Sequence, residues 1–514
     1  MFNKMISNPM LLIDGYKLCH KDQYPLGTEW TYETWIPRKS RIEGIRHALF
    51  FGLQGTLAEL YHSFKEGFFD RPLDEVMDEI RENVENVYGR TNSEMVANYD
   101  YSHFAALHKL GYLPIRIKAL KEGSFVPVGY KDDEIEVRGV PMWTIENTLP
   151  EFFWLPGYLE PLLSSYSWQP TTDATIADGY KRLLTKYAVL TGADVNAVFS
   201  QAGDFSMRGM GSPEAAYRSS CGHLLSFGVS STIQSRNYLK SYYGATADVL
   251  TYAPSTEHSV MCSYGRDEKA AFLRLITEVY PSGNVTIVSD TYDFWGVIDN
   301  ILPEIKDVIL SRKGRVAIRP DSGDPVKILC GDPESNDPTI RKGLIERLYE
   351  IFGGPITNKG YKALDPHIGA VYGDAITLER AAQIMEQLEK KGFASTTVVL
   401  GIGSYTYQYM TRDTLGFALK ATAEIAKGEF KPIYKDPKTD TDKFKKSLRG
   451  LVAVVMEDND YKVIDGLTPE TIGSVKGNLL EDFFVDGEFI FTQTFAEIRA
   501  RVASESPRVY GGAV

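Results

Sequence analysis

Cysteine is scarce in this chain, which has 4 cysteines among 514 residues. They are Cys19, Cys221, Cys262 and Cys330, and no two of them form a Cys-x-x-Cys pair. Their spacing therefore indicates neither a disulfide framework nor a zinc site. We expect free thiols in a reducing compartment, and the cytoplasm is the expected location.

Long apolar runs are also lacking. No stretch approaches the roughly 18 apolar residues that a transmembrane helix needs. The apolar burst at residues 10–13 is too short for the apolar part of a signal peptide. The sequence therefore favours a protein that neither crosses a membrane nor carries a signal for export.

Positive charge is the third shortage. Lysine and arginine number 56 against 68 acidic residues, which gives a formal net charge of −12. This balance argues against nonspecific binding to nucleic acid and against polybasic attachment to a membrane. It leaves room for a local basic pocket that binds phosphate groups.

The pattern of apolar residues predicts three segments. Residues 1–169 mix strand and helix patterns and predict a mixed α/β sheet domain. In residues 170–424, strand-like bursts alternate with helical periods, which is typical of a parallel sheet and predicts an irregular (β/α) barrel. We expect residues 425–514 to pack back onto the N-terminal segment, so that the two ends build a second, mixed α+β domain.

Several individual elements can be predicted within this framework. Residues 72–88 have the pattern of an amphipathic surface helix, and residues 154–168 that of a buried, aromatic-rich helix. Residues 115–128 alternate between polar and apolar side chains and predict one half-exposed strand. Thr377 is a plausible N-cap of a helix that covers residues 376–388.

The stretch from residue 284 to 325 contains two buried strand patterns, each followed by a polar cluster. Residues 285–288 precede Ser289 and Asp293, and residues 316–318 precede Arg319 and Asp321. Residues i and i+2 of an extended chain point to the same side, so Arg319 and Asp321 could face one ligand together. An ordinary ion pair at a strand end is the competing interpretation.

Other expected strand ends carry similar residues. The segment 401–404 reads Gly-Ile-Gly-Ser, and glycines with serine after a strand let backbone N–H groups approach a phosphate. It is neither a Walker A loop nor a dinucleotide fingerprint. Phe205 could stack on a flat ring, although a lone Phe usually belongs to the core. Together with the arginines and carboxylates, these features favour a phosphorylated sugar with Mg²⁺ as the ligand.

Short motifs along nearly the whole chain resemble those of one family. In order, they are Asp14-Gly15-Tyr16-Lys17, Phe51-Gly52-Leu53-Gln54, Asp204-Phe205 with Arg208-Gly209, Glu257-His258-Ser259, Val288-Ser289-Asp290, Arg319-Pro320-Asp321-Ser322-Gly323, Gly373-Asp374 and Thr411-Arg412-Asp413. Each motif is short, but the ordered set resembles the nicotinamide phosphoribosyltransferases, which are type II phosphoribosyltransferases. The resemblance implies transfer of phosphoribose from phosphoribosyl pyrophosphate to nicotinamide, a salvage step toward NAD.

The resemblance also implies roles for single residues in binding the base and the ribose. Phe205 would stack on one face of the pyridine ring, and the partner subunit's Tyr16 would cover the other. Arg319 would bind the carboxamide oxygen. The ribose would be held by Asp321, Gly373 and Asp374. Because Tyr16 would act in a neighbour's site, the resemblance implies a homodimer with shared active sites.

Further roles implied by the resemblance concern the phosphates. Arg208 would contact phosphate, and the 5′-phosphate would be bound by Gly403, Ser404 and Arg412. The positions that serve the phosphates across the dimer interface are Arg38, Lys420 and Lys435. Mg²⁺ would stabilise the leaving pyrophosphate.

His258 matches the family's phosphorylated histidine, whose phosphorylation by ATP drives the reaction forward. Ser289 and Asp293 would lie beside it, and Asp293 would orient the ring. Displacement of pyrophosphate builds positive charge on the ribose, which nearby carboxylates stabilise. No general base is needed, because the pyridine nitrogen is already nucleophilic.

Ser231 departs from the family pattern, because the family has an aspartate there that reads the carboxamide N–H₂. A serine hydroxyl can donate to a carboxylate or accept from an amide, so a nicotinate-using enzyme is the first alternative. A catalytically silent barrel with a binding or signalling role is another. A phosphosugar lyase would need a Schiff-base lysine at a strand end, and none is found there.

Overall fold

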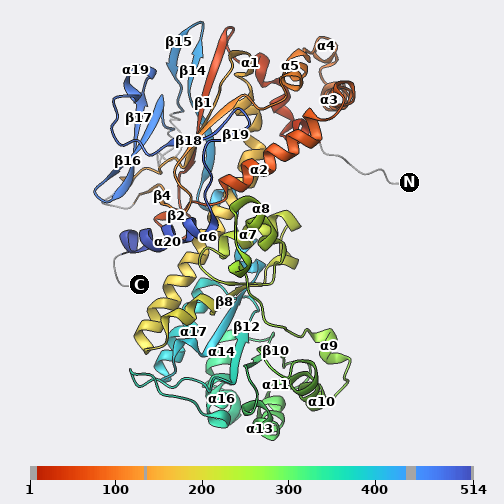
Figure 1. Ribbon diagram of the computed structural model, residues 1–514, viewed down its shortest axis with the longest axis vertical. Coiled ribbons are helices and arrows are strands. Elements are labelled where there is room, and N and C mark those ends of the chain that lie inside the picture. Colours follow the sequence, from red (N-terminus) through yellow and green to blue (C-terminus); the bar gives the residue numbers. More distant parts are fainter. Residues whose placement is uncertain (1–7, 132–135, 436–446, 511–514) are drawn as a thin grey trace. The chain divides into compact units, whose positions relative to one another are not determined.

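The computed structural model describes residues 8–131, 136–435 and 447–510 (Figure 1). The chain divides into two compact units. Unit 1 comprises Met1–Thr172, Ser241–Gly244 and Thr411–Val509, and unit 2 comprises Asp173–Lys240, Ala245–Met410 and Tyr510–Val514. Both ends of the sequence thus contribute to unit 1, while the middle of the sequence builds most of unit 2.

Unit 1 is organised on a seven-stranded antiparallel sheet with the order β15-β14-β1-β7-β3-β18-β19. These strands are β1 (Thr28–Pro37), β3 (Ile115–Ala119), β7 (Trp143–Asn147), β14 (Phe417–Ala426), β15 (Glu429–Pro432), β18 (Glu481–Val485) and β19 (Glu488–Phe489). In its centre, Trp35 stacks on Trp143 and on Phe417, with ring centroids 5.4 and 5.2 Å away. Aromatic packing therefore joins N-terminal and C-terminal strands in one core.

Helices of unit 1 bury one face each. They include α2 (Leu53–Phe64), α3 (Leu73–Tyr88) and α5 (Ser102–Leu110). In α3 the buried residues are Val76, Met77, Ile80 and Val84, which recur at helical spacing, while most of the acidic residues are exposed. The amphipathic helix predicted over residues 72–88 is therefore confirmed.

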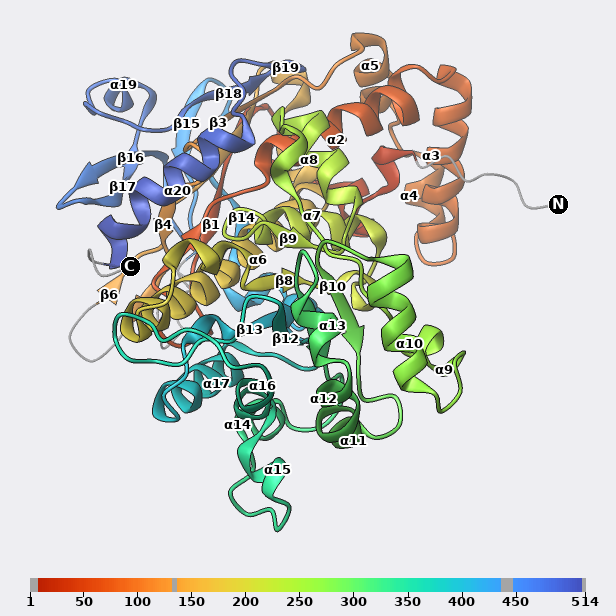
Figure 2. The same cartoon turned by 60° about the horizontal axis from the view of Figure 1, so that its bottom comes forward.

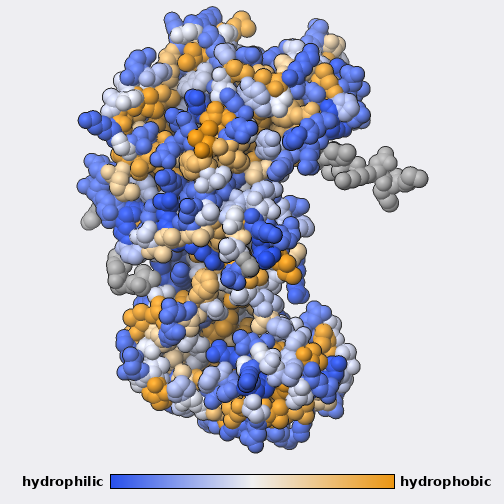
Figure 3. Space-filling view, viewed as in Figure 1, coloured by the Kyte–Doolittle hydropathy of each residue, from blue (hydrophilic) through white to orange (hydrophobic). Residues whose placement is uncertain are grey.

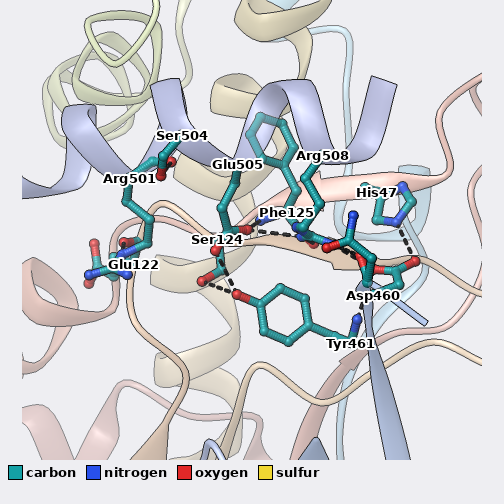
Figure 4. Close-up of polar contacts among 11 residues, drawn as sticks. His47, Glu122, Ser124, Phe125, Asp460, Tyr461, Arg501, Ser504, Glu505 and Arg508 are labelled. Atoms are coloured by element: carbon teal, nitrogen blue, oxygen red, sulfur yellow. Dashed lines mark hydrogen bonds and ion pairs between the residues drawn. The ribbon is translucent and has the colours of Figure 1, made fainter. Parts of the chain in front are cut away.

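The last helix, α20 (Phe495–Tyr510), is fastened by polar contacts to β4 (Phe125–Pro127) and β17 (Asp460–Leu467) (Figure 4). The hydroxyl of Tyr461 donates to Glu505 at 2.7 Å. Arg508 donates to Asp460 at 3.1 Å, and Nε2 of His47 lies 2.9 Å from the same carboxylate. Charge-assisted bonds of this kind fix a helix more firmly than neutral ones.

Unit 2 is built on a six-stranded parallel sheet with the order β10-β11-β12-β13-β8-β9. The strands are β8 (Ala202–Asp204), β9 (Val229–Ser230), β10 (Val285–Val288), β11 (Val316–Arg319), β12 (Ile368–Tyr372) and β13 (Val398–Ile402). The predicted alternation of strands and helices is confirmed. Beside this sheet, helix α14 (Pro325–Cys330) packs against both α16 (Leu344–Phe352) and α17 (Leu378–Lys390) (Figure 2).

The two edge strands of this sheet also pair with one connecting segment, residues 251–255. Thr251 forms a parallel bridge with Val229 of β9, and Ser255 forms one with Thr286 of β10. Backbone hydrogen bonds accompany both bridges; for example, Thr251 N–H donates to Gly228 O at 2.8 Å. The segment therefore stands beside both edges of the sheet.

The helix predicted over residues 154–168 proves much longer. Helix α6 covers Leu155–Thr191, 37 residues with Pro161 and Pro170 inside it. No helix in the described part of the chain is long and apolar enough to cross a membrane. The face drawn in Figure 3 is mainly hydrophilic, with apolar residues in scattered groups.

Candidate active site

The C-terminal ends of the parallel strands bring the predicted residues of unit 2 to one edge of the sheet. Val288 lies opposite Arg319 in the pairing of β10 with β11, and Ile402 lies opposite Asp204 in the pairing of β13 with β8. The residues that follow these strands must therefore meet at the same edge. In parallel α/β sheets this edge is where ligands bind.

Phe205 lies across the backbone of three glycines at this edge. A Cβ atom on Gly401 would lie 2.3 Å from the ring, on Gly203 3.0 Å, and on Gly373 3.1 Å. No side chain larger than hydrogen fits beneath this ring without displacing it. The guanidinium carbon of Arg319 lies 5.8 Å from the ring centroid. The result is a half-buried aromatic surface beside a cation, which suits a flat, polar ring.

Asp204 supports the loop next to Phe205 and is completely buried. Its carboxylate accepts hydrogen bonds from the backbone and hydroxyl of Ser206 at 2.9 and 2.6 Å, and from Ser230 and Thr232 at 2.9 and 3.0 Å. Four donors around one buried carboxylate satisfy its two oxygen atoms and fix the loop 230–232.

Ser231 lies in the middle of that loop. Its backbone N–H and its hydroxyl both donate to the backbone carbonyl of Asp204, at 2.9 and 3.0 Å. Because the hydroxyl proton is already used, the oxygen can offer only lone pairs to a ligand.

Arg319 and Asp321 lie together, as their spacing predicts. A terminal nitrogen of Arg319 is 3.0 Å from Asp321 Oδ1. Asp290 supports the pair, because its Oδ2 accepts from the Asp321 backbone at 2.9 Å and from the Ser322 hydroxyl at 2.6 Å. Asp290 therefore holds the turn that presents Asp321.

His258 opens the short helix α9 (His258–Cys262), and 46% of its side chain is exposed. Its Nε2 lies 3.6 Å from Asp290 Oδ1, and its Nδ1 lies 3.3 Å from the Thr291 hydroxyl. Asp290 thus connects the histidine to the Arg319–Asp321 pair. The ring is open to a second reactant from solvent.

The two residues that were expected beside His258 have other contacts. The side chain of Ser289 is buried, and its hydroxyl donates to Ile287 O at 2.8 Å. The carboxylate of Asp293 caps α11 (Phe294–Gly296) by accepting from Gly296 N–H at 3.0 Å. A role for Asp293 in orienting the histidine stays a prediction, and Asp290 is the carboxylate that lies near the ring.

Ser404 and Arg208 come from two segments in close contact. Gly403 precedes helix α18 (Ser404–Tyr407). The turn η6 (Met207–Gly209) packs so tightly against it that a Cβ on Gly209 would lie 2.0 Å from the Ser404 hydroxyl oxygen. The exposed Arg208 side chain is therefore carried on the segment that touches Ser404, which is a suitable arrangement for an anionic group.

Carboxylates are concentrated around Tyr372, at the end of β12. Its hydroxyl donates to Gly323 O at 2.8 Å. Burial chiefly raises the pKa of its phenol, and four acidic side chains act in the same direction: Asp374, Asp290, Asp321 and Asp324. Asp374 itself is exposed. Among the residues that the structure describes, no three His, Cys, Asp or Glu side chains form a ready metal site.

The other predicted residues belong to unit 1. Lys420, Arg38 and Arg412 are close enough to interact electrostatically, because the two arginines join burial, the larger cause, in lowering the pKa of Lys420. Arg38 Nε donates to Gly416 O at 3.1 Å. Such a basic group suits phosphate oxygens.

Tyr16 and Lys435, also in unit 1, are both exposed. Tyr16 is 55% exposed, and its ring centroid lies 4.9 Å from that of His20. The backbone N–H of Lys435 donates to the Ser447 hydroxyl at 2.6 Å, and the residue is exposed. An exposed tyrosine is available to a second molecule.

Sequence reasoning assigned no role to Asp204 or Asp290, although both follow predicted strands. Their importance comes from bonds to residues 26 to 32 positions away, such as Ser230, Thr232 and Ser322. The sequence feature that could have pointed to both residues is an acidic side chain close to the end of a predicted strand.

Comparison with known families gives one match over residues 200–464, to the nicotinate phosphoribosyltransferase (NAPRTase) family. The chain is 43% identical to a nicotinamide phosphoribosyltransferase from Acinetobacter baylyi, over 97% of both chains. It is 33% identical to a protein of the same name from Mycoplasma pneumoniae, over 84% of this chain and 93% of the other.

Two solved structures share the fold along nearly the whole chain. Human nicotinic acid phosphoribosyltransferase matches with a TM-score of 0.56 and 16% identity, covering 97% of this chain and 94% of the other. A nicotinate-nucleotide pyrophosphorylase from Pyrococcus furiosus matches with a TM-score of 0.55 and 15% identity, covering 99% of both. These structures bear on the arrangement of strands and helices.

Proposed function

Because this chain belongs to the nicotinate phosphoribosyltransferase family, we propose that it is a nicotinamide phosphoribosyltransferase. It transfers the 5-phosphoribosyl group from phosphoribosyl pyrophosphate to nicotinamide and releases pyrophosphate, in the salvage of NAD. Identity to relatives of that name over almost the full length supports the reaction. The hydrogen bond from Ser231 to Asp204 O is the observation that carries the choice of base.

The base binds on Phe205, which the three glycines hold flat at the sheet edge. Arg319 donates to the carboxamide oxygen, and the Ser231 oxygen accepts from the carboxamide N–H₂, because its own proton is donated to Asp204 O. A carboxylate in place of the amide would bring a second acceptor to this oxygen. The pocket therefore favours nicotinamide over nicotinate. The partner subunit's Tyr16 covers the other face of the base, which requires a homodimer.

The ribose lies against Asp321, Gly373 and Asp374. As pyrophosphate leaves, positive charge develops on the anomeric carbon, and the fixed carboxylate of Asp321 stabilises it. Asp290 helps to fix the position of Asp321, because its Oδ2 accepts a hydrogen bond from the Asp321 backbone N–H at 2.9 Å. The pyridine nitrogen attacks with its own lone pair, so no side chain has to remove a proton.

The phosphates bind to basic and glycine-rich segments. Gly403, Ser404 and Arg208 take phosphate in unit 2, where the Gly209–Ser404 contact joins them. Arg412, Arg38, Lys420 and Lys435 take phosphate in unit 1, from the same or the partner subunit. Guanidinium and ammonium groups suit phosphate oxygens because their charge strengthens each hydrogen bond.

Mg²⁺ fits the donor set near Tyr372, where carboxylates are the ligands that this ion prefers. Asp321 and Asp374 would hold it together with phosphate oxygens of the substrate, because no three acidic side chains of the described residues form a ready site and Mg²⁺ is often bound by one or two carboxylates and substrate phosphates. When bound, it neutralises charge on the leaving pyrophosphate.

ATP phosphorylates His258 and so drives the transfer forward. The exposed ring, with Asp290 on its Nε2 side, supports this assignment. Bound substrate phosphates and a phosphohistidine both favour Mg²⁺ through their negative charge. We also propose that the parallel sheet of unit 2 closes into an irregular barrel, which the bridges of Thr251 and Ser255 support.

The test is mononucleotide formation with phosphoribosyl pyrophosphate, Mg²⁺ and ATP, with nicotinamide and nicotinic acid offered in parallel. Preferential use of nicotinamide is expected. Preferential use of nicotinic acid would move the protein to the second candidate, a nicotinate phosphoribosyltransferase, which Ser231 in place of an aspartate would favour. No product from either base would favour a catalytically silent barrel.

A further inference from the structure

A buried histidine connects the two halves of the candidate site in unit 2. His223 is the last residue of α7 (Pro213–His223) and has no exposed surface. Its Nε2 lies 3.1 Å from the backbone carbonyl of Val229, the first residue of β9. Its Nδ1 lies 2.7 Å from the hydroxyl of Tyr407, the last residue of α18.

The partners of His223 determine where its protons lie. A carbonyl oxygen can only accept, so Nε2 carries the hydrogen and donates to Val229. In the neutral ring, Nδ1 then accepts from the Tyr407 hydroxyl. Burial, followed by nearby acidic groups, raises the pKa of Tyr407 well above its usual value, so the phenol keeps the proton that it donates.

Each of these contacts leads to a different part of the substrate site. On one side, Val229 lies two residues before Ser231, and α7 also reaches this loop through the Ser220 hydroxyl, 2.8 Å from that of Ser230. On the other side, Tyr407 lies in the same four-residue helix as Ser404. One imidazole therefore spans from the base-binding loop to the phosphate-binding helix.

The short helix α18, which carries Ser404, needs contacts of this kind to keep its orientation. A helix of four residues cannot hold its shape alone, because helix nucleation is unfavourable. Its other anchor is Thr406, whose hydroxyl donates to Ile376 O at 2.7 Å. Thr406 and Tyr407 together fix the orientation of α18.

We propose that His223 is a positioning residue that sets the spacing between the base-binding loop 230–232 and the phosphate-binding segment 403–404. The proposal rests on the proposed function, because it assumes that both segments bind one substrate pair. His223 touches neither substrate and acts through Val229 and Tyr407. Loss of either contact lets one segment move relative to the other, so substrate binding weakens more than the chemical step.

Two substitutions separate the two contacts. His223→Asn keeps an acceptor near the position of Nδ1 and loses the donor to Val229. His223→Gln keeps a donor near the position of Nε2 and loses the acceptor for Tyr407. We expect His223→Asn to raise the KM for nicotinamide and His223→Gln to raise the KM for phosphoribosyl pyrophosphate, each about fivefold, with kcat within about twofold.

Tyr407→Phe is the variant to use if the histidine variants fail to fold, because it removes one oxygen and keeps the ring. It should raise the KM for phosphoribosyl pyrophosphate about fivefold and leave that for nicotinamide unchanged. Tyr361→Phe is the matched control. Its hydroxyl donates to Glu389 of α17 at 2.9 Å, and neither residue belongs to the candidate site.

Binding is measured alongside turnover, as the rise in melting temperature when phosphoribosyl pyrophosphate or nicotinamide is added to each variant. A smaller rise with phosphoribosyl pyrophosphate in Tyr407→Phe, but not in Tyr361→Phe, supports the proposal. A lower melting temperature of the free protein with unchanged KM values and unchanged ligand shifts would show a merely structural role and overturn it. If the unaltered protein forms no mononucleotide, the proposed function fails instead.

Discussion

Two carboxylates at the same sheet edge have opposite surroundings. Asp204 is completely buried and accepts four hydrogen bonds from Ser206, Ser230 and Thr232. Asp290 Oδ1 is also buried, but within the described chain it has no hydrogen-bond partner, and His258 Nε2 lies 3.6 Å away. The Asp204 network is complete without a ligand, whereas Asp290 near the histidine still has one carboxylate oxygen without a hydrogen-bond partner among the described residues.

Glu268, the first residue of α10 (Glu268–Arg274), extends this contrast. It is 6% exposed, and its Oε1 has no hydrogen-bond partner among the described residues. Burial, then the charges of Asp293 and Asp290, raise the pKa of its carboxyl group. Unsatisfied acidic groups suit a region that, in the proposed function, gains a phosphoryl group and a cation during turnover, while Asp204 suits a region that keeps its contacts.

The largest effect is expected from removing the carboxylate of Asp204, which accepts four hydrogen bonds. Asp204→Ala leaves three buried hydroxyl groups without their acceptor, and should lower the melting temperature by roughly 5 °C or more and abolish transfer. Differential scanning calorimetry and the mononucleotide assay measure both. Asp204→Asn, which keeps one acceptor oxygen, should have a melting temperature between those of Asp204→Ala and the unaltered protein. A wild-type melting temperature for Asp204→Ala would mean that the network does not hold the loop.

His258→Ala should leave the melting temperature nearly unchanged but remove the effect of ATP on the reaction. Because the ring is exposed, we expect a melting temperature within about 1 °C of the unaltered protein. ATP should no longer increase mononucleotide yield, since the nitrogen proposed to accept the phosphoryl group is gone. Thr291→Ala, which removes the contact to Nδ1, serves as the control and should keep most of the ATP effect. Continued stimulation by ATP in His258→Ala would contradict the role of the histidine.

Ser231→Asp sharpens the assignment of the base pocket. A carboxylate at this position accepts from an amide but repels the carboxylate of nicotinate, so residual use of nicotinate should fall by about tenfold while use of nicotinamide persists. The ratio of kcat/KM for the two bases is the measurement. Ser231→Ala, which removes the acceptor, should raise the KM for nicotinamide about fivefold. An unchanged ratio in Ser231→Asp would show that other groups read the amide.

The smallest effect concerns Glu268 and pH. A carboxyl group with a raised pKa binds its proton more tightly in the folded state, so its contribution to stability is present at low pH and is lost as pH rises from about 4.5 through the raised value. Glu268→Gln removes this loss. The melting temperature of the variant, relative to the unaltered protein, should therefore increase between pH 5 and pH 8. A constant difference would show that Glu268 does not titrate as described.

The strands of unit 2 could be predicted closely from the sequence. Residues 285–288 form β10, and the second burst forms β11 through Arg319. Thr377 caps α17 by accepting from Arg380 N–H, as its position predicts. Short buried strands bounded by polar residues, and helices with a capping side chain, are determined by local chemistry.

One prediction about unit 1 was wrong, and the helix predicted over residues 154–168 is confirmed but continues much further. Residues 115–128 form two strands, β3 and β4, in separate sheets, because the chain turns at Gly123, whose φ is +92°. Helix α6 runs far beyond Trp168 because Pro170 does not end it. A proline removes one backbone hydrogen bond, a cost of roughly 3 kcal/mol, which packing along a long buried helix outweighs.

The site could be predicted in part. The chemistry of Arg319, Asp321 and Phe205 follows from residues near in sequence. The contacts of Asp204, Asp290 and His223 depend on segments that fold together from distant positions, and the absence of local periodicity hides them. Hydrogen bonds between residues far apart in the chain are visible once the strands are paired.

The bridges made by residues 251–255 have a consequence for self-association. An open parallel sheet presents unpaired N–H and C=O groups along both outer strands, and these are templates for strands of other molecules. Here Thr251 and Ser255 occupy positions beside β9 and β10, the two outer strands. The same short segment therefore covers part of both edge strands and opposes aggregation through them. Substitutions that loosen it should promote strand pairing between molecules before they affect the reaction.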